Sequence, residues 1–151
     1  LYYSPESEWK DLLSNLRRSA LCRRCAVHAV MMASSTRSRT STTWLYNHFA
    51  GKYFGCRNDQ DLRGFGRELS ASREFRGYRF MTTTHRVEFF IDDFSRFMAV
   101  VWMILLYPNV HDYSPQQRRE ITTYMLDEFW MKGIPLVQMQ DHLIMTAGLL
   151  G

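Results

Sequence analysis

The sequence has few of the residues that would indicate a cross-linked or disordered protein. Its 151 residues include 3 cysteines, 4 prolines and 8 glycines, while 46% are hydrophobic. So few cysteines exclude a disulfide-rich scaffold, and the hydrophobic content excludes a disordered or low-complexity chain. A chain of this length can bury a core without a metal or disulfide, so we expect a single domain spanning residues 1–151.

Long hydrophobic runs are also missing. The longest, Phe97–Tyr107, has eleven residues, whereas a membrane-spanning helix needs about 20. The first residues do not have the pattern of a secretory signal peptide. We therefore expect no transmembrane segment in this chain and an intracellular, cytoplasmic location, which unpaired thiols also favour. Association with mitochondria is left open.

Motifs of catalysis and metal binding are scarce. The chain has no nucleotide-binding loop, nucleophile elbow or HExxH sequence. Cys22 and Cys25 have CxxC spacing, but no second pair completes a zinc site. The five histidines are scattered along the chain: His28, His48, His85, His111 and His142. We expect a protein that is not an enzyme and has no cofactor and no metal site.

Charge is unevenly distributed along the chain. Lys and Arg total 19 against 15 Asp and Glu, a net charge of +4, and 16 of the 19 are Arg. Residues 1–90 contain 15 basic and 8 acidic residues, while residues 91–151 contain 4 and 7. The basic part is a solvated surface, a face for nucleic acid, or a face for an acidic protein partner.

Hydrophobic residues recur at helical spacing along most of the chain. No segment shows sustained period-two alternation, so we predict no strand. The fold class is therefore all-α: a globular helical bundle of about seven helices around a central hydrophobic helix. The expected helices are residues 5 to about 32, 44–55, 62–75, 82–94, 97–107, 115–132 and 135–145.

Local signals set the ends of several of these helices. Ser4 and Pro5 are typical of a helix start, and Asn58, Asp59 and Asp61 are candidate caps of the third helix. Residues 114–117 form a capping box with Pro115 at the first helical position. Gly133 is the expected end of that helix, and residues 34–43, which include no apolar residue, indicate an exposed loop.

The most informative stretch is residues 87–102. Val87, Phe90, Ile91 and Phe94 have helical spacing, and a short polar step ending in Arg96 leads into the apolar run. Charge at the start of a buried helix must be solvated or paired. Arg96 is therefore either paired locally with an acidic neighbour or exposed beside an aromatic groove, where it can meet an acidic residue of a ligand.

This stretch resembles the first homology motif of the B-cell lymphoma-type (Bcl) family of apoptosis regulators. That motif reads Asn-Trp-Gly-Arg at the start of the central helix, where this chain has Asp93-Phe-Ser-Arg96. Residues 62–68 are similar to the third motif, with Arg67 in place of its Asp, and residues 130–133 are similar to the start of the second. Because these motifs match only in part, the resemblance implies a divergent member of the family, such as a viral homologue.

The resemblance implies an apoptosis regulator of the pro-survival type. It would bind the amphipathic death-motif helix of pro-apoptotic proteins in a hydrophobic surface groove, with Arg96 pairing with the ligand Asp. The resemblance supplies the helix order and hence the expected groove residues: Phe49, Tyr53, Val87, Phe90, Ile91, Phe94, Phe97 and Val100, beside Arg96. A homodimer through the same aromatic residues is left open.

Two alternatives remain from the sequence. An Arg-rich helical nucleic-acid-binding protein would use residues 1–90, with bases stacked on Tyr and Phe and an affinity that falls steeply with salt. A structural α-helical assembly protein would form oligomers and have no affinity for amphipathic peptides.

Overall fold

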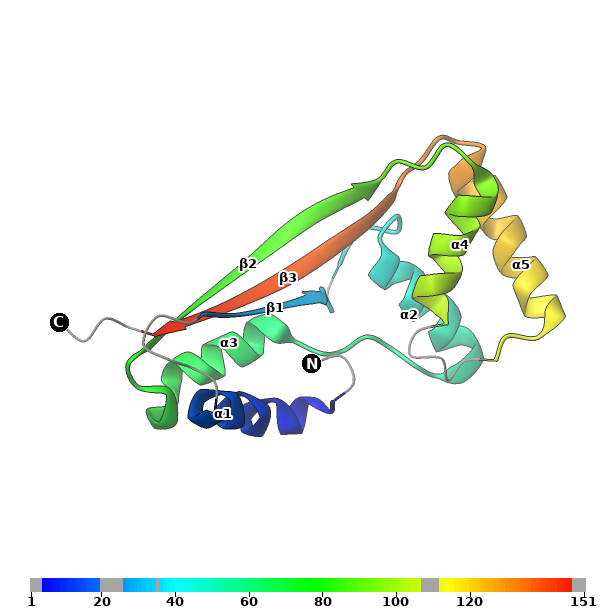
Figure 1. The fold of residues 1–151 in the computed structure, drawn as a ribbon. Helices are drawn as coiled ribbons and strands as arrows, with labels where there is room; N and C mark the ends of the chain where they lie inside the picture. The colour runs from blue at the N-terminus through cyan, green and yellow to red at the C-terminus, as the bar shows by residue number, and fades with distance from the viewer. Residues whose placement is uncertain (1–3, 20–25, 35, 107–111, 148–151) are drawn as a thin grey trace. The chain divides into compact units, whose positions relative to one another are not determined.

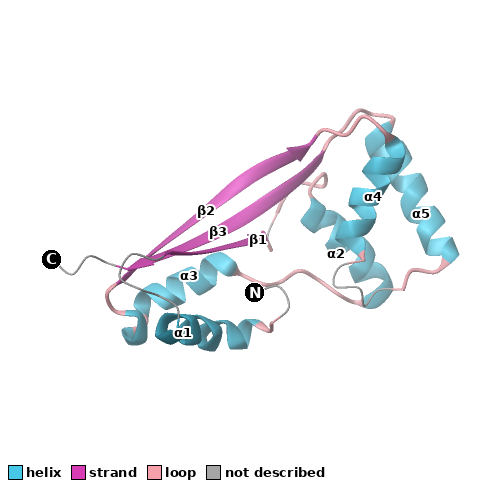
Figure 2. Ribbon diagram, viewed as in Figure 1, coloured by secondary structure: helices cyan, strands magenta, loops and turns pink. Residues whose placement is uncertain are grey.

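The computed structural model describes residues 4–19, 26–34, 36–106 and 112–147, and the fold is mixed α/β (Figure 1). Helices form 51% and strands 24% of the structure, with five α-helices and one three-stranded antiparallel sheet in the described part (Figure 2). The all-α prediction, and with it the bundle of about seven helices, is wrong. The elements in chain order are η1 (Glu6–Glu8), α1 (Trp9–Ser19), β1 (Ala26–Met32), α2 (Thr42–Phe54), α3 (Leu62–Ala71), η2 (Arg73–Phe75), β2 (Tyr78–Phe89), α4 (Phe94–Leu105), α5 (Pro115–Met125), η3 (Leu126–Trp130) and β3 (Leu136–Ala147).

The chain forms two compact units, each with its own hydrophobic core. Unit 1 comprises Leu1–Ala33, Gln60–His85 and Gln140–Gly151, and unit 2 comprises Ser34–Asp59 and Arg86–Met139. β2 and β3 therefore each contribute residues to both units. The expectation of one domain over residues 1–151 stays a prediction.

In unit 1, α1 and α3 lie on the same side of the strands (Figure 1). The strand order is β1-β3-β2, and β1 runs antiparallel to β3 with Val30 opposite His142. Because side chains alternate along a strand, the buried residues Met31 and Leu143 face the helices while Val30 and His142 face away. The buried core of this unit is Trp9, Leu13, Met31, Leu62, Phe65, Leu69, Phe75, Leu143 and Met145.

Unit 2 is built from α2, α4, α5 and the π-helical turn η3, together with the unit 2 portions of β2 and β3. A backbone hydrogen bond joins the loop before α2 to β3: the Val137 amide donates to the Thr40 carbonyl at 3.1 Å. The buried core of this unit is Leu45, Phe49, Phe97, Met98, Val101, Leu105, Tyr113, Ile121, Met125, Phe129 and Leu136.

Polar side chains begin four of the helices. Asp61 accepts from the Gly64 amide at 2.8 Å, and the predicted capping box is confirmed because Ser114 and Gln117 bond each other's backbone amides. Ser41 and Asp93, which the sequence analysis does not identify as caps, accept from backbone amides at 3.1 and 2.8 Å. These bonds satisfy donors that a helix start leaves free.

Three stretches that were predicted to be helical are strands instead. β1 occupies the end of the helix expected to reach Met32, β2 occupies most of the one expected over residues 82–94, and β3 replaces the one expected over 135–145. The strands do not alternate cleanly between polar and apolar residues because both faces of β2 and β3 are partly covered over much of their length. Tertiary pairing therefore decided their conformation.

The apolar run does form a helix, α4, but it is not a central rod. Its buried residues, Phe97, Met98, Val101 and Leu105, lie toward one side, and Met103 is 66% exposed. No helix in the described ranges is long and apolar enough to cross a membrane. Four residues named from the sequence lie outside the described residues: Cys22, Cys25, Tyr107 and His111.

Candidate functional site

A cavity of unit 2 is formed where two chain connections meet. The first connection leads from the end of β2 at Phe89 to the cap of α4 at Asp93. The second leads from Trp130 at the end of η3 through Gly133, with φ of 62°, to the start of β3. The left-handed turn at Gly133 suits a residue without a Cβ, and it returns the chain from helix to strand.

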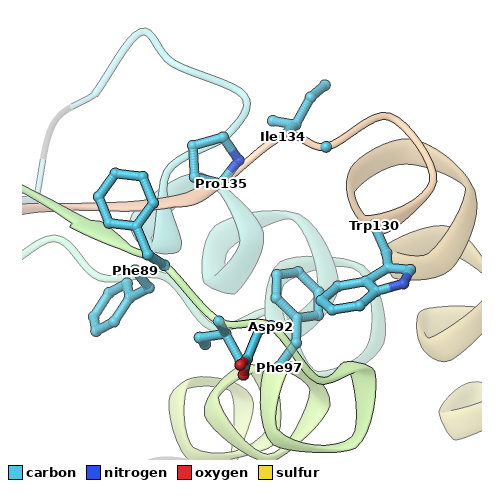
Figure 3. Close-up of a pocket in the computed structure, with 9 residues that line it drawn as sticks. Phe89, Asp92, Phe97, Trp130, Ile134 and Pro135 are labelled. Carbon is cyan, nitrogen blue, oxygen red and sulfur yellow. The ribbon is translucent and has the colours of Figure 1, made fainter.

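The pocket has a volume of about 540 Å³ and an aromatic lining (Figure 3). Phe97 is buried, whereas Phe90 is 84% exposed. The Trp130 ring lies 5.6 Å from the Phe97 ring and 5.5 Å from the Phe94 ring, so Trp130 is held by two aromatic neighbours. The lining residues are Phe89, Phe90, Ile91, Asp92, Phe97, Trp130, Gly133, Ile134 and Pro135.

A π-helical turn places Trp130 in this wall. After α5, the backbone widens over Leu126–Trp130, and the Met131 amide donates to the Leu126 carbonyl five residues earlier at 2.9 Å. The Ile134 amide donates to the Phe129 carbonyl, again five residues earlier, at 2.9 Å. Such turns are rare and occur frequently at functional sites. Phe129 is buried in the core, so the turn is anchored there.

Two charged residues lie beside the apolar lining. Asp92 is an exposed lining residue, and Arg96 is exposed in the first turn of α4, next in sequence to Phe97. No oppositely charged side chain among the described residues forms an ion pair with either of them. The local pairing of Arg96 with an acidic neighbour is thus not formed, although its backbone amide bonds to Asp93. The site therefore combines an apolar pocket with two charged side chains, Asp92 and Arg96, at its edge.

The structure brings together three of the predicted groove residues, Phe90, Ile91 and Phe97. The others do not line the pocket. Phe49 is buried in the unit 2 core; Tyr53, Phe94 and Val100 are partly buried against that core; Val87 is half-buried in β2. A groove walled by helices of an all-α bundle is not formed, because the chain entering and leaving this pocket runs in strands.

The sequence analysis missed much of the lining. Phe89, Asp92, Ile134 and Pro135 join the site only because the end of β2 and the start of β3 belong to one sheet. Trp130 stands out in the sequence only through the resemblance to a family motif, whereas Gly133 is also the expected end of a helix. Aromatic residues directly before a helix cap and a Gly-Ile-Pro turn after a helix are the signals that could have indicated them.

A separate cluster of ionisable groups joins α2 to α5. Lys52 forms an ion pair with Glu120, and this bond raises the pKa of Lys52 and lowers that of Glu120. His48 stacks on Trp44 at 4.6 Å between ring centres, and burial, followed by the charge of Lys52, lowers its pKa. The cluster holds two helices together.

Metal ligation has no support in the part of the chain that the structure describes, where no group of three or more His, Cys, Asp or Glu could hold an ion. Cys56 is a free thiol there, and its Sγ lies 3.6 Å from the Phe54 carbonyl oxygen.

Comparison of the chain with protein-family models, curated proteins and solved structures finds no match. The relationship to the Bcl family therefore stays a prediction. The helical bundle that went with it is wrong, because residues 78–89 and 136–147 are strands. Nothing in the structure or the comparisons supports a role in apoptosis or a viral origin, and neither is proposed.

Proposed function

We propose that this chain is a protein-interaction module whose unit 2 pocket receives an apolar side chain from an amphipathic helix of a partner protein. The observation that carries the proposal is Phe90, which is 84% exposed at a pocket that Phe97 and Trp130 also line. Exposing such a ring costs stabilisation that burial against a partner would supply, about 1.5–3 kcal/mol for one Phe side chain.

The size and charge of the pocket support a helix as the ligand. A volume of about 540 Å³ accommodates one or two large apolar side chains. Residues three or four apart on a helix present two such side chains on one face. Arg96 has no ion-pair partner among the described residues, so its guanidinium is available to a carboxylate on the flank of that helix.

The test uses fluorescence anisotropy with a panel of labelled amphipathic helical peptides. We expect at least one peptide with apolar anchors and a flanking Asp to bind, and Phe90→Ser to weaken that binding about tenfold, since one lost aromatic contact is worth about 1.4 kcal/mol or more. The matched control is Met103→Ser, because Met103 is 66% exposed on α4 and lies outside the pocket lining.

In the same titration, Arg96→Ala should weaken the Asp-containing peptide about tenfold and leave its Asn counterpart unchanged. Equal affinities of the wild type and Phe90→Ser, or no binding across the panel, would show that the proposal is wrong. A labelled RNA or DNA probe that is retained at about 50 mM salt and lost at about 200 mM would instead support the nucleic-acid alternative.

A further inference from the structure

Three histidines lie side by side across the three strands of unit 1. The Nε2 atom of His28 on β1 is 3.0 Å from the Nδ1 atom of His142 on β3, and the two ring centres are 5.0 Å apart. The His85 ring on β2 lies 4.5 Å from the His142 ring on its other side. His28 and His142 project from the sheet face opposite α1 and α3. We call these three residues the histidine row.

The hydrogen bond in this row requires that at least one of the two rings is uncharged. A neutral imidazole has one N–H and one bare nitrogen, whereas an imidazolium has two N–H groups. If His28 and His142 were both charged, two donors would face each other and the bond would be lost. The Nε2 atom of His142 is buried and has no hydrogen-bond partner among the described residues. Charging His142 would therefore also leave an unpaired N–H in a buried position.

The groups around His142 favour its neutral form. Its pKa is lowered by burial, then by His85 on β2 and His28 on β1. Asp141, the preceding residue of β3, acts in the opposite direction. Asp141 is buried on the helix side of the sheet and accepts a hydrogen bond from the Thr84 hydroxyl at 2.6 Å. The effect of Asp141, which raises the pKa of His142, is smaller than the lowering by burial, His85 and His28 together.

We propose that the histidine row is a pH-sensitive latch that holds strand β1 to the sheet at neutral pH and releases it in acid. β1 is an edge strand that pairs with β3 alone, so the His28–His142 contact supplements a single ladder. When the latch opens, His142 loses the cover of β1 and the neighbouring His28 ring, so its pKa rises toward the ordinary 6.5 and it takes up a proton more readily. The stabilisation is thus present above 6.5 and is lost as pH falls from there through the lower pKa of the closed state.

The test is hydrogen exchange of the full chain, followed by mass spectrometry at about pH 7.5 and about pH 5.5, with rates corrected for intrinsic pH dependence. Protection of the amides in β1 should fall in acid relative to those in α4, by up to about tenfold per pH unit for each proton taken up on opening. Equal changes in β1 and α4 would overturn the proposal.

Variants separate the latch from a general effect of acid. His142→Phe keeps a ring but cannot be charged, so β1 protection should lose its pH dependence. His28 is exposed, so His28→Gln should fold, and its amide oxygen can accept from a charged His142, which should also reduce the dependence. His48→Gln, in unit 2, is the control that should retain the pH dependence of β1 protection. An unchanged dependence in both unit 1 variants would show that the row is not the sensor.

Discussion

At the scale of single residues, the packing of unit 1 requires that Gly66 has no side chain. Gly66 lies in α3 and is buried against the sheet. A Cβ at this position would lie 2.5 Å from the Thr82 Cγ2 atom and 3.0 Å from the Leu143 Cδ1 atom. The helix backbone therefore approaches β2 and β3 more closely than any larger residue would allow.

We expect Gly66→Ala to lower the free energy of unfolding by about 1–3 kcal/mol, because overpacking outweighs the gain of about 1 kcal/mol in helix propensity. Urea unfolding measures the change. Adding Thr82→Ser removes the clashing methyl group and should recover part of the loss. Gly51→Ala in α2 is the control, since its Cβ would meet the Cys56 carbonyl oxygen at an ordinary 3.5 Å. Wild-type stability of Gly66→Ala would contradict the prediction.

Single residues of the candidate sites could be predicted from the sequence only where they are close in the chain. Phe90, Ile91 and Phe97 stand within one aromatic stretch and were predicted together. His28 and His142 are 114 positions apart, and no local pattern relates them. Their contact follows from a strand register, which cannot be read from either segment alone.

At the scale of elements, the helices with polar caps were the predictable ones. α3 begins after Asp61 and α5 after Ser114, as the sequence indicates, because cap bonds are made within four residues. The strands had no comparable local signal. The three threonines of β2 lie at the start of the helix expected over residues 82–94, although their β-branched side chains favour a strand. Leu136 and Val137 of β3 are both buried, which removes the alternation expected of a strand.

The capping box of α5 gives a prediction at this scale. We expect Ser114→Ala to cost about 1 kcal/mol of stability and Ser114→Gly only a few tenths, because alanine leaves the Gln117 amide without its partner and glycine favours the cap conformation. Urea unfolding of the two variants measures both values. Wild-type stability of Ser114→Ala would mean that the hydroxyl does not act as a cap in solution.

At the scale of the whole molecule, the described residues form two hydrophobic cores. Composition and length predicted a chain able to bury a core, and this holds for each unit. The number of cores could not be predicted, because it depends on which distant segments pair. Unit 1 takes three separate stretches of chain and unit 2 takes two.

Separate cores predict separate responses to cavity-forming substitutions. Leu69 and Leu136 are both buried, the first in unit 1 and the second in unit 2. Each Leu→Ala change should cost about 2–5 kcal/mol and lower amide protection first in its own unit. Hydrogen exchange of the two variants provides the comparison, with α1 amides reporting on unit 1 and α4 amides on unit 2. Identical exchange patterns would contradict it.

The strand order β1-β3-β2 has a consequence for how the protein is made. On the ribosome, the first and second strands emerge well before the third, which must lie between them. At typical elongation rates the interval between the end of β2 and the start of β3 is about 2–10 s. Throughout that time the nascent chain carries two strands whose natural neighbour has not been synthesised, so both are open to wrong partners. Translation speed between these strands and chaperone supply should therefore affect the yield of native protein.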